Sequence, residues 1–143
     1  KCIVNDQNNY CRANNRGIRE SQGEYIALVN NDINVTAQWL KELIAVMVSD
    51  TTVGAAGGKI LFTDGRIQSA GHEEHPGFYW RDRGYKECDN GQYNEIGEVS
   101  SVCGVCVLYR RACLDNAGLL DEDFHMYVKD VDYGYNVIYM WYD

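Results

Sequence analysis

The chain has 143 residues, of which 45% are apolar, and a formal net charge of −8. This length suits one domain with a hydrophobic core, and the negative charge argues against a nucleic-acid partner, because phosphate binding needs a basic face. An anionic nucleotide would therefore need a cation as mediator. The sequence contains no apolar run of about 18 residues, which a membrane span would need, and we find no signal peptide. We therefore expect a cytoplasmic location, or one at the inner face of the membrane.

The first part of the chain predicts a short apolar run and a surface helix. Cys2 to Val4 is apolar, but no earlier strand and crossover helix precede it, as a parallel sheet would need. We therefore expect a fragment of a larger domain. Residues 8–22 are polar and carry a helical spacing, and Gly23 directly afterwards predicts the C-cap.

Residues 25–29 predict the buried strand around which the rest of the chain is organised. None of these residues is polar, which is typical of a strand that is covered on both faces in a parallel sheet. Asn30, Asn31 and Asp32 follow directly. Because ligands in open α/β sheets bind outside the carboxyl ends of the strands, we predict that Asp32 holds a metal ion.

The middle of the chain predicts a packing helix followed by an antiparallel hairpin. Thr36 is the expected N-cap, and apolar residues lie on one helical face from Trp39 to Met47. Residues 53–56 predict a short buried strand. Two further runs, 59–62 and 66–70, flank the dipeptide Asp64-Gly65, which is a strong hairpin signal. We therefore expect a mixed sheet that is mainly parallel, with an antiparallel excursion.

Residues 71–98 differ from the rest in being rich in glycine and aromatic side chains. A structureless stretch of this length inside a compact domain is usually functional or disordered. Sugars present apolar C–H faces that stack on rings, so this segment is our candidate for acceptor contact or a closing lid. The alternative is a mobile loop whose aromatic side chains pack against the body. Those side chains are Phe78, Tyr79, Trp80, Tyr85 and Tyr93.

Histidine and cysteine residues offer two weak metal motifs. His72 and His75 enclose two glutamates, but the spacing is wrong for a helical zinc site and a proline follows. Cys103 and Cys106 are a single Cys-x-x-Cys pair within the strand expected over 102–109, where residues three apart point to opposite faces. Because the six cysteines are irregularly spaced, we expect reduced thiols, with these two in the core.

The last part of the chain predicts a short helix over 112–117, ended by Gly118, and then a longer one. An apolar stripe of helical spacing runs through Val128, Val131, Tyr135, Ile138 and Tyr142. Asp130 and Asp132 lie near the start of that helix. Two residues apart is about 200° around a helix, so only one of the two carboxylates can face a given pocket.

Several segments form a recognisable series along most of the chain, namely 15–18, 23–26, 30–32, 57–62, 64–68, 70–71, 118–122 and 129–132. In this order they resemble family 2 glycosyltransferases, and in particular their rhamnosyltransferase-like members. The metal motif of that family is usually Asp-x-Asp or Asn-Asn-Asp. The resemblance implies a partial GT-A fold, a Rossmann-like α/β fold of nucleotide-diphospho-sugar transferases, lacking the N-terminal nucleotide-binding strands.

The resemblance also implies a function and a site. It implies inverting transfer of a sugar from a nucleoside-diphosphate sugar donor to a hydroxyl of a carbohydrate or glycolipid acceptor, in the synthesis of a surface polysaccharide or glycoconjugate. Asp32 would hold a divalent cation, Mn²⁺ or Mg²⁺, while Asp130 would take the proton from the attacking oxygen. Asn15, Asn30 and Asn31 would contribute to the donor site. Lys129 departs from the glutamate usual beside the base.

Two other functions stay open at this point. The first is a catalytically silent fragment or binding module that keeps the scaffold without a complete donor site. The second is a thiol or zinc module built from Cys103, Cys106 and the cluster that begins at His72.

Overall fold

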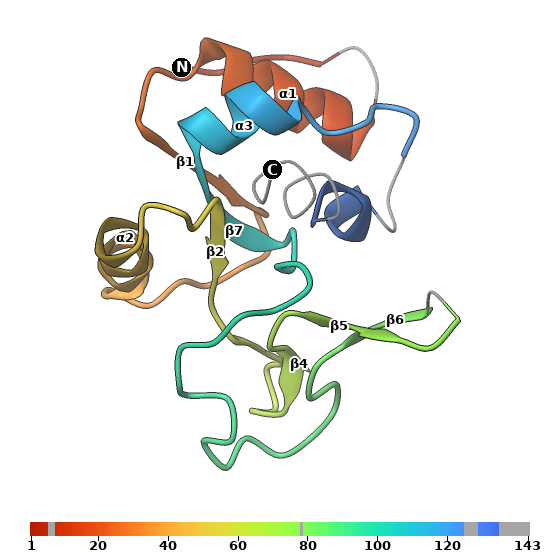
Figure 1. The fold of residues 1–143 in the computed structure, drawn as a ribbon. Helices are drawn as coiled ribbons and strands as arrows, with labels where there is room; N and C mark the ends of the chain where they lie inside the picture. The colour runs from red at the N-terminus through yellow and green to blue at the C-terminus, as the bar shows by residue number, and fades with distance from the viewer. Residues whose placement is uncertain (6–7, 78, 125–128, 135–143) are drawn as a thin grey trace.

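A computed structural model describes residues 1–5, 8–77, 79–124 and 129–134. The described residues form both helices and strands, as expected for an α/β protein, and most of the strands follow one another along the chain after the second helix (Figure 1). The helices are α1 (Tyr10–Glu20), α2 (Trp39–Ser49) and α3 (Arg111–Ala117), and residues 129–134 are also helical. The strands are β1 (Tyr25–Val29), β2 (Ala55–Gly57), β3 (Ile60–Leu61), β4 (Ile67–Ser69), β5 (His72–His75), β6 (Tyr79–Asp82) and β7 (Cys106–Arg110).

The central sheet has the strand order β1-β7-β2. Strand β7 lies between β1 and β2 and runs antiparallel to both, so β1 and β2 point in the same direction. The prediction of a mainly parallel sheet is not confirmed, because every hydrogen-bonded strand pair in the described residues is antiparallel. An apolar run predicts how a strand is buried, but it carries no information on the direction of a neighbour about 80 residues away.

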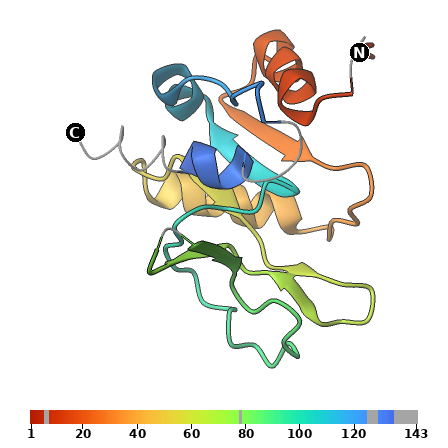
Figure 2. The ribbon, with the colours of Figure 1, turned by 90° about the vertical axis from the view of Figure 1, so that its right-hand side faces the viewer.

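Helices cover the two faces of this sheet. Helices α1 and α3 lie together on one face, and α2 packs against β2 and β7 on the other (Figures 1 and 2). Val107 and Tyr109 of β7 lie in the hydrophobic core between the sheet and the helices α1 and α3, while Leu108 lies in the second core, between the sheet and α2. Strand β1 alternates between buried Ile26 and Leu28 and exposed neighbours, so the prediction that it is covered on both faces is wrong.

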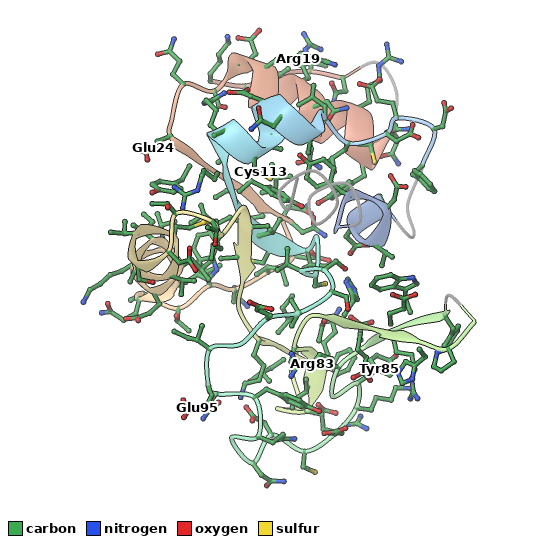
Figure 3. The ribbon with its side chains drawn as sticks, in the orientation of Figure 1. Arg19, Glu24, Arg83, Tyr85, Glu95 and Cys113 are labelled. Atoms are coloured by element: carbon green, nitrogen blue, oxygen red, sulfur yellow. The ribbon has the colours of Figure 1, made fainter. Side chains whose placement is uncertain are left out.

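The hairpin predicted on Asp64-Gly65 is confirmed as β3 and β4, and Gly65 takes a positive φ of 84° in its turn. The following segment, 71–98, is not structureless. Its first part forms the β5–β6 hairpin, and residues 83–88 then bond back to β4, with Lys86 N donating to Ile67 O and Ile67 N donating to Glu87 O. Figure 3 shows Arg83, Tyr85 and Glu95 in this part of the molecule, away from α1 and α3.

Several boundaries differ from those expected. Helix α1 ends at Glu20, because Ser21 rather than Gly23 is the C-cap, and its hydroxyl donates to the Ile18 carbonyl. Helix α2 begins at Trp39 after Gln38, so Thr36 is not its N-cap. Strand β7 begins at Cys106, which leaves residues 102–105 as a loop.

The helical prediction around Asp130 is confirmed for residues 129–134, and its continuation to Tyr142 lies outside the described residues. In the part of the chain that the structure describes, no helix combines the length and apolar character that a membrane crossing requires.

Candidate active site

One edge of the central sheet gathers most of the residues that the sequence singled out. In the register of the sheet, Val29 at the end of β1 pairs with Cys106, and Gly57 at the end of β2 pairs with Val107. The carboxyl ends of β1 and β2 therefore flank the loop that enters β7, residues 102–105. This edge lies above the β5–β6 hairpin, next to the short helix of residues 129–134 (Figures 1 and 2).

The first part of the candidate site is the turn after β1. Asn30 donates its backbone N–H to the Val105 carbonyl at 2.9 Å, which holds the start of the turn against the entry to β7. Asn31 and Asp32 follow in a turn and are exposed. The turn thus presents a carboxylate and two amides to solvent beyond the sheet.

The second part is Asp130, whose side chain is 17% exposed. Its Oδ2 accepts the backbone N–H of Gly104 at 3.0 Å, and its Oδ1 accepts that of Val131 at 3.2 Å. A Cβ atom at position 104 would lie 3.2 Å from the Asp130 Cβ, so glycine allows this close approach. Because residues 104 and 105 contact Asp130 and Asn30 respectively, the loop brings the two predicted functional segments to one edge.

Asp132 faces a different part of the molecule. Burial and the neighbouring Asp121 carboxylate raise the pKa of its carboxyl. The two aspartates thus point to different surroundings, as their offset of about 200° on a helix predicts.

The helix that carries Asp130 is anchored on its other side. Val131 and Tyr133 are buried, and the Tyr133 ring meets Tyr109 of β7 edge-on with centroids 5.4 Å apart. The Tyr133 hydroxyl also donates to the Gly118 carbonyl at 2.8 Å. The sheet therefore fixes the position of Asp130 through packing as well as through the loop.

Tyr10, in the first turn of α1, supports the same loop. Its hydroxyl donates to the Gly104 carbonyl, and the Lys129 ammonium lies 4.3 Å from the centre of its ring. Burial, with the Asp130 charge as a second cause, raises the pKa of the Tyr10 phenol, so this hydroxyl stays a donor at neutral pH.

Asn15, predicted to contribute to the donor site, is buried within the protein. Its amide nitrogen donates to the Leu120 carbonyl at 2.7 Å and its oxygen accepts the Leu120 N–H at 3.0 Å. The nitrogen also contacts Glu122 Oε1 at 3.0 Å. Asn15 thus fixes the segment after α3 to α1, and its contribution to nucleotide binding stays a prediction.

A polar cluster beside Asp130 contains His72 and Cys103, which the sequence offered as parts of a thiol or zinc module, together with Asp82, which was not predicted. His72 Nδ1 lies 2.7 Å from Ser101 Oγ, and His72 Nε2 lies 3.3 Å from Asp82 Oδ1 and 3.9 Å from Asp130 Oδ2. The hydrogen bond from His72 holds the pKa of the Asp82 carboxyl below its usual range. Cys103 completes the cluster, and burial raises the pKa of its thiol. These residues are far apart in sequence and carry no motif spacing, so only the strand pairing could have revealed them.

Comparison with known proteins decides the family. The family model described as "Glycosyl transferase family 2" matches residues 1–118. The chain belongs to glycosyl transferase family 2. This family 2 chain is 33% identical over 135 residues to "O-antigen biosynthesis protein RfbC" of Myxococcus xanthus, covering 88% of the chain and 10% of that protein. It is 32% identical over 142 residues to "Uncharacterized protein y4gI" of Sinorhizobium fredii (strain NBRC 101917 / NGR234), covering 87% of the chain and 14% of that protein.

The chain therefore spans about a seventh or less of the length of these relatives. Its membership of the family implies the GT-A fold, in agreement with the α/β arrangement found here.

The residues after β1 fit a divalent cation. Mg²⁺ and Mn²⁺ prefer oxygen ligands, and the turn offers the Asp32 carboxylate together with the amide oxygens of Asn30 and Asn31. Asp32 is the residue that would hold such an ion, since it carries the only negative charge of the three.

Proposed function

We propose that this chain carries the catalytic core of an inverting glycosyltransferase, which moves a sugar from a nucleoside-diphosphate donor to an acceptor hydroxyl. The observation that carries the proposal is the common edge of Asp32 and Asp130. Asn30 and Asp130 bond to neighbouring residues of one loop, Val105 and Gly104. A carboxylate for a cation and a carboxylate for a proton are therefore held on one rigid support.

The two carboxylates have surroundings that suit different tasks. Asp32 is exposed in a turn, where an anionic ligand and a cation have room to bind. A bound divalent cation would supply positive charge to the departing diphosphate. Asp130 is largely buried and is held by two backbone N–H groups. Each of its carboxylate oxygens still has a lone pair that can accept a hydrogen bond from a further donor. It is therefore positioned to accept the proton of an acceptor hydroxyl.

The acceptor side of the proposal rests on the segment next to Asp130. Strands β5 and β6 form a hairpin whose end at His72 and Asp82 lies beside Asp130, and Tyr79 at its other end is 63% exposed. Exposed aromatic rings stack on the apolar faces of sugars. Because RfbC is described as an O-antigen biosynthesis protein, we include a polysaccharide or glycolipid as the acceptor class in the proposal.

The experiment is isothermal calorimetry of the full chain with a panel of nucleoside diphosphates, each with and without Mn²⁺. We expect at least one nucleotide to bind in a Mn²⁺-dependent manner. Asp32→Asn should abolish that dependence with little change in stability, because the side chain is exposed. Asp115→Asn is the matched control, since this aspartate is exposed on α3.

Equal Mn²⁺-dependent affinities of wild type and Asp32→Asn would contradict the assignment of Asp32. Nucleotide binding without any donor hydrolysis or transfer, across a panel of nucleotide sugars, would instead favour the silent binding module.

A further inference from the structure

The cluster around His72 is built by the pairing of three backbone segments. His72 and Asp82 are direct partners in the antiparallel β5–β6 hairpin, so their side chains lie on the same face. On its other side, His72 forms a bridge with Ser101, with His72 N donating to the Ser101 carbonyl at 2.9 Å. Cys103 follows two residues after Ser101. The backbone therefore fixes three potential ligands from distant parts of the chain.

We propose that His72, Asp82 and Cys103 form a binding site for a transition-metal ion of the zinc class, separate from the cation site at Asp32. A ring nitrogen, a carboxylate oxygen and a sulfur are the donor types found in zinc sites. Their ligand atoms all lie within 4.8 Å of one another. A thiolate ligand disfavours the hard cations Mg²⁺ and Mn²⁺, so the two sites should select different metals.

The distance between the histidine and the carboxylate matches the dimensions of a tetrahedral site. With metal–ligand bonds of about 2.0–2.2 Å, two nitrogen or oxygen ligands of one zinc ion lie roughly 3.4 Å apart. The distance of 3.3 Å between His72 Nε2 and Asp82 Oδ1 agrees with this value. The ring and the carboxylate would thus need only a small adjustment to bind one ion.

The residues around the three ligands hold them in suitable orientations. Metal-binding histidines usually bond through their second ring nitrogen to a neighbour that fixes the ring. His72 Nδ1 has such a neighbour in Ser101 Oγ at 2.7 Å, which leaves Nε2 facing Asp82. Asp82 is held opposite His72 by the pairing of β5 with β6. The ring and the carboxylate therefore face each other before any ion arrives.

The proposed site has three protein ligands, which leaves the fourth position of a tetrahedral ion open. Asp130 Oδ2 lies 3.9 Å from His72 Nε2. An ion at this site would therefore lie directly beside the residue that we propose as the catalytic base.

The test is a titration of the full chain, freed of metal by a chelator, with Co²⁺ as a spectroscopic substitute for Zn²⁺. We expect one Co²⁺ per chain, with the absorption bands of a tetrahedral ion and a thiolate-to-cobalt charge-transfer band. Zn²⁺ should displace the Co²⁺, and Mn²⁺ should not.

Variants identify the ligands in the same titration. Cys103→Ser should remove the charge-transfer band, and Asp82→Asn should weaken Co²⁺ binding by about 100-fold or more, because even outer partners of a metal site contribute 10–100-fold. Cys88→Ser, at an exposed cysteine, is the matched control and should leave the band unchanged. Asp32→Asn should also leave it unchanged, which separates this proposal from the proposed function.

The proposal is overturned if the wild-type chain shows no thiolate band, or if the band persists in Cys103→Ser. Loss of the band in Cys88→Ser or Asp32→Asn would also overturn it, since either result places the ion elsewhere. If Cys103→Ser does not fold, Asp82→Asn decides the outcome alone, because Asp82 is only half-buried and its replacement preserves the shape of the side chain.

Discussion

Replacing Asn15 by alanine tests how the segment after α3 is held in place. The Asn15 side chain is 1% exposed, and it pairs with both backbone polar groups of Leu120, which is itself 5% exposed. Alanine cannot replace either hydrogen bond. The substitution would therefore leave one buried N–H and one buried carbonyl group without a partner.

The expected cost follows from these two groups. An unsatisfied buried donor or acceptor costs about 1–3 kcal/mol, so the two groups together should lower the free energy of unfolding of Asn15→Ala by about 2–6 kcal/mol. Domains are usually stable by about 5–15 kcal/mol, so a variant at the middle of this range should still fold. With a urea m-value of about 2 kcal/mol/M, the midpoint of unfolding should fall by about 1–3 M.

The measurement is urea unfolding followed by circular dichroism, with Asn14→Ala as the matched control. Asn14 is the adjacent amide on α1, and its side chain donates to the Tyr10 carbonyl of its own helix. Its replacement should cost about 1 kcal/mol or less, because the side chain is only half-buried and alanine is a strong helix former. Equal midpoints of unfolding for the two variants would refute the conclusion that Asn15 fixes the segment after α3 to α1. A loss of nucleotide affinity in Asn15→Ala with no loss of stability would instead place the amide at the donor.

Two further predictions concern the neighbouring aspartates on the last helix. Asp130→Asn should keep donor binding, since the new amide oxygen can still accept the Gly104 N–H, but it should slow sugar transfer by about 10²–10⁴-fold, measured as initial rates with an active donor. For Asp132 the folded-state pKa is raised, so ionisation opposes folding once the pH exceeds the pKa of the unfolded chain. Asp132→Asn should therefore gain stability relative to wild type as the pH rises from acid to neutral. Unfolding midpoints that shift in parallel with pH for both proteins would contradict this.

The elements that the sequence predicted well are those set by local patterns. The Asp64-Gly65 turn specified its hairpin, and the apolar run over 25–29 specified β1, because turn chemistry and side-chain periodicity act over a few residues. Helix ends were less well predicted. Ser21 ends α1 two residues before the glycine that we expected to do so, because a serine hydroxyl can also satisfy a terminal carbonyl.

The features that sequence reasoning missed depend on long-range pairing. The direction of β7 relative to β1, and the cluster of His72 with Asp82 and Cys103, are set by contacts between segments 10–80 residues apart. The cysteine pair illustrates the difference. We predicted a strand from residue 102, but it begins at Cys106, so Cys103 lies in the loop and is free to face the histidine.

The position of β7 between β1 and β2 also affects how the chain can fold during synthesis. Among the described strands, both outer strands pair with β7, which comes about 80 residues after β1. At translation rates of about 5–20 residues per second, the ribosome needs roughly 4–16 s to make that stretch. During this interval the pairing of β1 with β7 cannot form. The sheet edge and the site that it supports are therefore completed only after residue 110 has left the ribosome.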